Sequence, residues 1–166
     1  MRREGVSTMS EHHEHHPNHQ KANDIVAVLE PYFAKLPSLP KNAKETLVKV
    51  MPWIALIFGI LGVLGAVSGL GLLGVTSPLA VFGGVEGVAS YGTGMIAALF
   101  WLVSAALMLA AYPGLKNHQL KGWNLMFWSE AVNIIGAVVS ISGILNGVLW
   151  GIVGFYILYQ IKSYYK

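Results

Sequence analysis

Four long runs of apolar residues occupy most of the chain after residue 50. They cover residues 51–73, 93–112, 123–142 and 144–161, and short stretches rich in glycine, proline, serine or lysine separate them. Each run is long enough, as a helix, to cross about 30 Å of hydrocarbon. The pattern therefore predicts an all-α integral membrane protein in which residues 51–166 form an antiparallel four-helix transmembrane bundle.

The breaks between the runs indicate where the helices end. Ser142–Gly143 is the only break between the last two runs, so we expect a tight antiparallel hairpin there. Pro113–Gly114 follows the second run and should end its helix, because proline cannot continue a helix and glycine tolerates the left-handed cap.

The connection over residues 74–92 is too apolar for an ordinary exposed loop. Ser77 followed by Pro78 is typical of a helix start. We expect a short helix in the outer membrane interface, with a re-entrant half-helix that lines a pore as the alternative. Glu86 argues against deep insertion, because a carboxylate in hydrocarbon is costly.

A different pattern precedes the first run, in the segment 23–50. Apolar residues recur there at the spacing of one helix face: Ile25, Val28, Leu29, Tyr32, Phe33 and Leu36. The pattern predicts an N-terminal amphipathic cytoplasmic helix over residues 24–36, bent at Pro31. Its apolar stripe fits equally an interfacial or docking helix, for the inner leaflet or a cytoplasmic or membrane protein partner, and a cover for the end of its own bundle. A second short helix should begin near Asn42 and join the first span at Pro52.

The first part of the chain, residues 1–22, is polar and is expected to be a disordered tail. Its histidines are weak candidates for metal ligands: His12, His13, His15, His16 and His19. Imidazoles at this density bind Zn²⁺, Ni²⁺ or Cu²⁺ adventitiously. The other interpretation is a solvated tail whose charge changes near pH ~6.5.

The positions of the charged residues predict an orientation. Only 11% of the residues are charged, whereas soluble domains have about a quarter. All 11 lysines and arginines lie before residue 50, at positions 116 and 121, or at positions 162 and 166, so four crossings place them on one side. The positive-inside rule makes that side cytoplasmic, with both termini inside a plasma or inner membrane. Membrane lipids are the expected partners, and no nucleic-acid partner is expected.

Small residues recur at close spacing in the first and last runs. The candidate helix-packing positions are Gly62, Gly65, Gly69, Gly143, Gly147 and Gly151. Small residues let helix backbones approach closely in a membrane, where the hydrophobic effect does not drive helices together. Packing within one bundle explains them, and so does self-association. Because two such faces exceed the needs of one compact bundle, we expect a homo-oligomer.

The third run contains a small polar stripe with one carboxyl group. Glu130 and Asn133 are one helical turn apart, Ser129 is adjacent, and no Lys or Arg lies in any predicted span. We therefore expect Glu130 to be protonated or to touch a water-filled cavity. The stripe is a candidate proton or cation site. The alternative is a structural hydrogen bond between helices, for example to Ser104 or Asn146.

The composition limits the function classes. Cysteine is absent, which excludes disulfides, thiol chemistry and cysteine-ligated metals. Within the predicted spans Glu130 has no His, Asp, Lys or Arg beside it, so no catalytic residue and no cofactor is expected, and an enzyme is not indicated. The first hypothesis is a self-associating structural or partner-binding component of a membrane. The alternative is a small oligomeric channel or a proton- or cation-coupled transporter that uses Glu130.

Overall fold

A computed structural model describes residues 17–139 and 144–166 of the chain. Within these residues the chain forms five α-helices, a 3₁₀ turn and no strand. The helices are α1 (Pro17–Ala34), α2 (Lys41–Phe82), α3 (Gly84–Lys116), α4 (Leu120–Val139) and α5 (Ile144–Ile161), and the 3₁₀ turn η1 covers Lys162–Tyr164.

The helical prediction is confirmed, and part of the structure has the properties of membrane spans. Among the described residues, three helical segments are long and apolar enough to cross a membrane: Lys41–Phe82, Gly84–Lys116 and Ile144–Tyr164. The helix α4, predicted as a fourth span, is not one of these three. Asn124, Glu130 and Asn133 interrupt its apolar sequence and lower its mean hydropathy.

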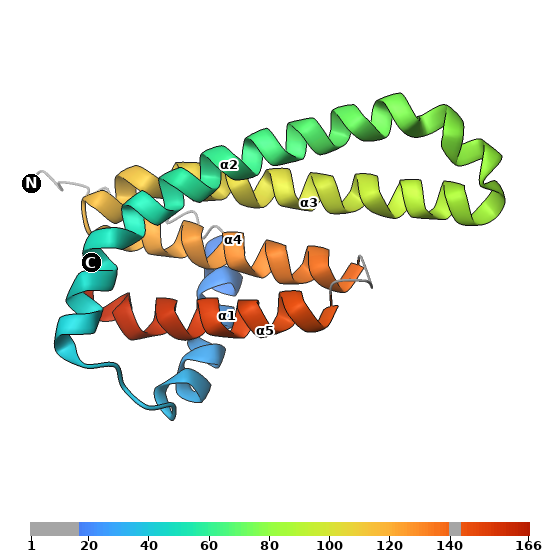
Figure 1. Cartoon of the computed structure of the whole chain (residues 1–166). Helices are drawn as coiled ribbons and strands as arrows, with labels where there is room; N and C mark the ends of the chain where they lie inside the picture. Colours follow the sequence, from blue (N-terminus) through green and yellow to red (C-terminus); the bar gives the residue numbers. More distant parts are fainter. Residues whose placement is uncertain (1–16, 140–143) are drawn as a thin grey trace, which may run out of the picture.

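The four long helices pack in chain order. The helix α3 lies between α2 and α4, and α5 packs against α4, so they follow one another from top to bottom in Figure 1. Direct contact between α2 and α5 is slight. The group is therefore open along one side, between its first and last members.

The most tightly packed part of the core lies at one end of the helices. Trp123, Phe127, Leu115 and Ile161 are fully buried there. The indole Nε1 of Trp123 donates a hydrogen bond to the backbone oxygen of Leu158 at 2.8 Å, which ties α4 to α5. Burial of these large side chains stabilises the packing of the helices at this end.

The C-terminus is fixed to the turn between α3 and α4. The backbone nitrogen of Leu120 donates to the oxygen of Lys166 at 2.8 Å, and the nitrogen of Lys166 donates to the oxygen of His118 at 3.0 Å. The α3–α4 connection and the chain end therefore lie at the same end of the molecule.

The helices α2 and α3 form a hairpin that is much longer than the α4–α5 pair. They have 42 and 33 residues, whereas α4 has 20 and α5 has 18. At about 1.5 Å per residue, α2 is about 63 Å long and α5 about 27 Å. The hairpin tip, which we define as residues 74–92, projects beyond the ends of α4 and α5 (Figure 1).

The proline signals of the sequence did not end helices. Pro78 lies inside α2 and Pro113 lies inside α3, so the helix start expected at Ser77–Pro78 and the helix end expected at Pro113–Gly114 are wrong. At Pro52, where the sequence placed the join between a short helix and the first span, α2 continues from Lys41 without a break. Proline leaves the carbonyl four residues earlier without its helical donor. At Pro78 that carbonyl belongs to Gly74, and the hydroxyl of Ser77 donates to it at 2.8 Å. The two helices turn instead at Gly83 and at Gly84, whose φ of 63° suits glycine.

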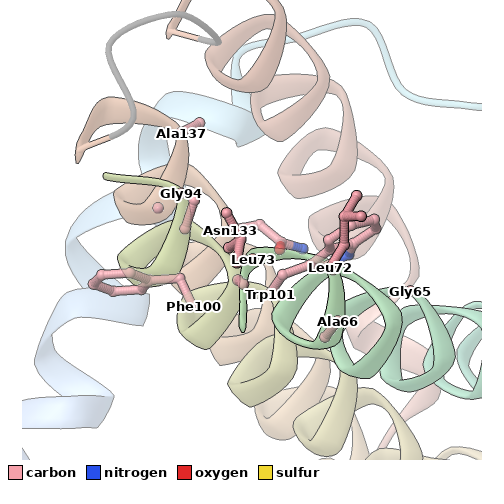
Figure 2. Close-up of a pocket in the computed structure, with 13 residues that line it drawn as sticks. Gly65, Ala66, Leu72, Leu73, Gly94, Phe100, Trp101, Asn133 and Ala137 are labelled. Carbon is pink, nitrogen blue, oxygen red and sulfur yellow. The ribbon is translucent and has the colours of Figure 1, made fainter. Parts of the chain in front are cut away.

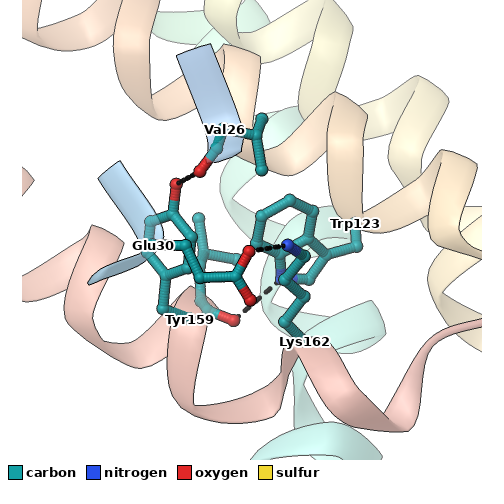
Figure 3. Close-up of polar contacts among 6 residues, drawn as sticks. Val26, Glu30, Trp123, Tyr159 and Lys162 are labelled. Atoms are coloured by element: carbon teal, nitrogen blue, oxygen red, sulfur yellow. Dashed lines mark hydrogen bonds and ion pairs between the residues drawn. The ribbon is translucent and has the colours of Figure 1, made fainter. Parts of the chain in front are cut away.

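The helix α1 packs against α5 at the well-packed end. Val26 is buried, and the ring of Phe33 stacks on that of Tyr159 with centroids 4.9 Å apart. The Tyr159 hydroxyl donates to the oxygen of Val26 at 2.8 Å, and Lys162 Nζ lies 2.6 Å from Glu30 Oε2, as Figure 3 shows. The helix thus packs across the C-terminal part of α5.

Other apolar residues of α1 face outward. Ile25, Val28 and Tyr32 on the helix, and Leu36 just after its end, are exposed large apolar side chains. The predicted stripe is therefore divided, with Phe33 and Leu29 packed inside and these four outside. The packed half of the stripe agrees with a helix that covers its own bundle. The exposed half agrees with an interfacial or docking helix.

The beginning of α1 differs from the predicted boundary. The helix begins at Pro17, whereas the predicted helix begins at residue 24. Pro17 suits the first turn of a helix, and Gln20, Lys21 and Ala22 are good helix formers. Residues 1–16 lie outside the described residues, as do the Ser142–Gly143 break and the metal-ligand candidates His12, His13, His15 and His16.

Candidate functional site

The three polar candidates on α4 point in different directions. Consecutive helical residues are about 100° apart, so Ser129 and Glu130 cannot share one face. Ser129 is fully buried toward α3, where its Oγ lies 2.8 Å from Ser104 Oγ. Ser129 Oγ also donates to the Ser104 oxygen at 3.0 Å, and Ser104 Oγ is 3.1 Å from the Ser129 oxygen. This residue ties two helices together and is not part of an open site.

Glu130 faces a cavity of about 540 Å³, which we call the Glu130 cavity. The carboxyl group lies over Gly154 of α5, since a Cβ built on that glycine would be 2.6 Å from Glu130 Oε1. The absent side chain at this position therefore makes the space that the carboxyl group uses. Glu130 forms no hydrogen bond or ion pair with any other residue that the structure describes.

The wall of the Glu130 cavity is apolar apart from the carboxyl group. Its lining includes Met51, Phe58, Met108, Met126, Trp150 and Val153. Phe58 on α2 and Trp150 on α5 are 58% and 68% exposed. The cavity thus opens at the surface between the two helices that barely contact each other.

Asn133 lines a second cavity of about 460 Å³, the Asn133 cavity, formed by α2, α3 and α4. Leu73, Phe100 and Trp101 line the same cavity, as Figure 2 shows. Neither Glu130 nor Ser129 lines this space. The polar stripe that the sequence suggested is therefore distributed over a buried contact and two separate cavities.

The glycine candidates mostly lie against neighbouring helices of the same chain. A Cβ on Gly62 would be 2.8 Å from Ala105 Cβ, and one on Gly65 would be 3.3 Å from the Trp101 ring. Gly147 and Gly151 face α4 in the same way. Gly69 differs, because nothing lies within 4 Å of its built Cβ. Gly143 lies outside the described residues.

The described residues contain no group of three or more His, Asp or Glu side chains arranged to hold a metal ion. Of the candidate histidines, His19 lies within α1. The metal hypothesis therefore stays with the histidine-rich tail.

Sequence reasoning found Glu130 but missed what surrounds it. Met51, Met108 and Met126 come from three different helices and meet at one cavity, and Trp150 comes from a fourth. A methionine in an apolar run looks the same whether it lies in a core or on a cavity wall. In the sequence, the carboxyl group of Glu130 was the only residue feature that pointed to this site.

Comparisons with protein-family models, with curated proteins and with solved structures find no match to this chain. The structural features that bear on the function are therefore the two cavities, the long hairpin and the outward face of α1.

Proposed function

We propose that the protein is a self-associating structural component of a membrane, and that the projecting part of the α2–α3 hairpin is the association surface. The proposal includes four crossings by α2, α3, α4 and α5, with α1 and both termini on the cytoplasmic side of a plasma or inner membrane. The partner is a second copy of the chain.

The observation that carries this proposal is the apolar surface of the hairpin tip. Phe82 and Val85 are each 87% exposed, and Val75 and Leu79 are also strongly exposed. If α4 and α5 match the hydrocarbon thickness, most of the tip extends past the hydrocarbon. Apolar side chains in that position gain free energy when another surface covers them.

Several glycines in or near the hairpin tip have free space around them, which suits a close contact between helices. Nothing lies within 4 Å of a Cβ built on Gly69, Gly71, Gly74 or Gly92. No atom of the chain covers these positions, so another helix backbone can approach them. At Gly69 the free space is part of the Asn133 cavity. Membrane helices associate through such small residues, where close packing supplies the attraction.

The proposed orientation rests on the basic residues and the packing together. Lys162 and Lys166 lie at the same end as Lys116 and Lys121, because the C-terminus pairs with the α3–α4 turn. The positive-inside rule favours the cytoplasm for that end.

A channel through one chain has less support. Glu130 and Asn133 line different cavities, and Ser129 is occupied by its contact with Ser104. A conducting path needs polar groups in series. The described residues supply isolated ones, so the geometry favours association over conduction.

The test is the oligomeric state in lipid nanodiscs, measured by native mass spectrometry. The wild type should form dimers or larger assemblies, whereas Gly69→Leu with Gly74→Leu should be mainly monomeric, because added side chains keep the helices apart. The fold of the monomer should survive, since both positions have open space.

The control is Ala106→Leu, which introduces one leucine at an exposed position of α3 away from the tip. It should associate like the wild type. A monomeric wild type, or a double variant that associates as strongly as the wild type, would overturn the proposal.

A further inference from the structure

The Glu130 cavity combines one carboxyl group with apolar walls, and this combination selects a class of ligand. The walls bring together three thioethers, from Met51, Met108 and Met126, and the aromatic rings of Phe58 and Trp150. We infer that the Glu130 cavity binds a lipophilic organic monocation, which enters from the membrane between α2 and α5. This binding site is independent of self-association through the hairpin tip.

Charge complementarity is the first argument. Glu130 has no cationic partner among the described residues, and the basic side chains of the chain lie outside the apolar runs. A carboxylate in an apolar surrounding is strongly stabilised by a single opposite charge, because the interaction is poorly screened there. One carboxylate matches one positive charge.

Small metal cations fit the cavity poorly. Calcium takes six to eight oxygen ligands, and magnesium requires near-octahedral oxygen coordination. Among the residues that the structure describes, Glu130 is the only charged one that lines the cavity, and the other lining residues are apolar or glycine. A metal ion would have to keep most of its water in an apolar space, which is costly. A cation covered by hydrocarbon groups has no such requirement.

The apolar walls are suited to the remainder of such a ligand. Methionine is flexible and polarizable, and surfaces rich in methionine adapt to ligands of different shape. Phe58 and Trp150 present aromatic rings that attract cations. The volume of about 540 Å³ is in the range of sites for drug-sized molecules.

The route of entry follows from the packing. The helices α2 and α5 contact each other only slightly, and Phe58 and Trp150 at the mouth are mostly exposed. If the long helices cross the membrane, this mouth faces lipid. A lipophilic cation partitions into the membrane and reaches the cavity without crossing water again.

The test is titration calorimetry with tetraphenylphosphonium on the full chain in nanodiscs. The wild type should bind it, and Glu130→Gln should weaken the affinity at least tenfold. Glu86→Gln removes the same charge from the exposed hairpin tip and should leave the affinity unchanged. Triphenylphosphine oxide, which is neutral and similarly aromatic, should bind the wild type far more weakly than the cation.

A second variant keeps the test decisive if Glu130→Gln does not fold. Trp150 is mostly exposed, so Trp150→Ala should fold normally and weaken tetraphenylphosphonium binding at least threefold. The Gly69→Leu and Gly74→Leu variant should bind the cation like the wild type, which separates this site from the association surface. No binding by the wild type, or equal binding by wild type, Glu130→Gln and Trp150→Ala, overturns the inference.

Discussion

Ser104 of α3 and Ser129 of α4 form a reciprocal hydrogen-bonded pair in the packed interior. Their hydroxyl oxygens are 2.8 Å apart, and each hydroxyl also lies within 3.1 Å of the backbone oxygen of the other residue. Both side chains are 1% exposed. This pair links the long hairpin to the short one where no water is available.

Either single alanine substitution in this pair should destabilise the protein by about 1 kcal/mol, because it removes the bond between the two hydroxyls and the bond of the deleted hydroxyl to the backbone oxygen opposite. The Ser104→Ala and Ser129→Ala double variant should cost less than the sum of the two single variants, since both groups are then removed. Unfolding in a denaturing detergent measures this coupling. Ser90→Ala, at an exposed position of α3, is the control.

Gly122 should not tolerate a side chain, because α4 begins in direct backbone contact with α3. A Cβ built on Gly122 would overlap Leu115 and Gly114, and one on Gly114 would be 2.6 Å from Gly122 Cα. We expect Gly122→Ala to cost at least about 2 kcal/mol, as backbone cannot move aside easily. Gly92→Ala meets no atom within 4 Å and should change the midpoint of thermal unfolding little. Similar midpoints for the two variants would contradict the close approach.

The buried Tyr165 and the partly buried Tyr159 should respond differently to loss of the hydroxyl. Tyr159→Phe removes the hydrogen bond to Val26 and should loosen α1 at a cost of about 1 kcal/mol. Tyr165→Phe removes a buried hydroxyl that has no hydrogen-bond partner within the described structure, so stability should be unchanged or higher. Thermal unfolding followed by circular dichroism compares the two. Greater destabilisation by Tyr165→Phe would contradict this assignment.

Alkaline pH should reveal the environment of Tyr165. Burial raises the pKa of Tyr165 from 10.0 to about 12, because the charged phenolate is poorly solvated there. The folded state therefore holds the proton more tightly than the unfolded state. This contribution to stability is complete below pH 10 and is lost as the pH rises toward 12. Stability of the wild type should fall more steeply over this interval than that of Tyr165→Phe.

The outward face of α1 should lie in the membrane interface. A spin label on Tyr32→Cys should be accessible to oxygen dissolved in lipid, whereas one on Lys35→Cys should be accessible to a water-soluble relaxation agent. The chain has no native cysteine, so labelling is specific. Both labels reporting water would favour a protein partner or a free surface over the inner leaflet.

The sequence predicted where the long helices lie, because uninterrupted apolar runs of this length have few alternatives. It did not predict how far they extend. Pro113 signalled a helix end and Ser77–Pro78 a helix start, yet α3 and α2 continue through them. At Pro78 a neighbouring hydroxyl replaces the missing donor. Such compensation depends on local geometry that residue type alone does not reveal.

Prediction of the candidate site had a similar limit. Glu130 was found because a carboxyl group in an apolar run is unusual. The grouping with Ser129 and Asn133 relied on spacing along one helix, whereas cavities depend on which helices surround each face. The neighbours from α2, α3 and α5 determine that Glu130 meets methionines and Asn133 meets Phe100 and Trp101.

The unequal lengths of the two helical hairpins bear on the choice of membrane. A bilayer that matches α4 and α5 is too thin for the apolar length of α2 and α3, and the mismatch costs a fraction of a kcal/mol per Å. A thicker bilayer lowers the mismatch penalty for the long hairpin and raises it for the short one. The bilayer around the protein should therefore be thicker beside the long hairpin than beside the short one. This deformation would favour association of copies, because fewer lipids are then deformed. It would also enrich the protein in thicker regions of the membrane.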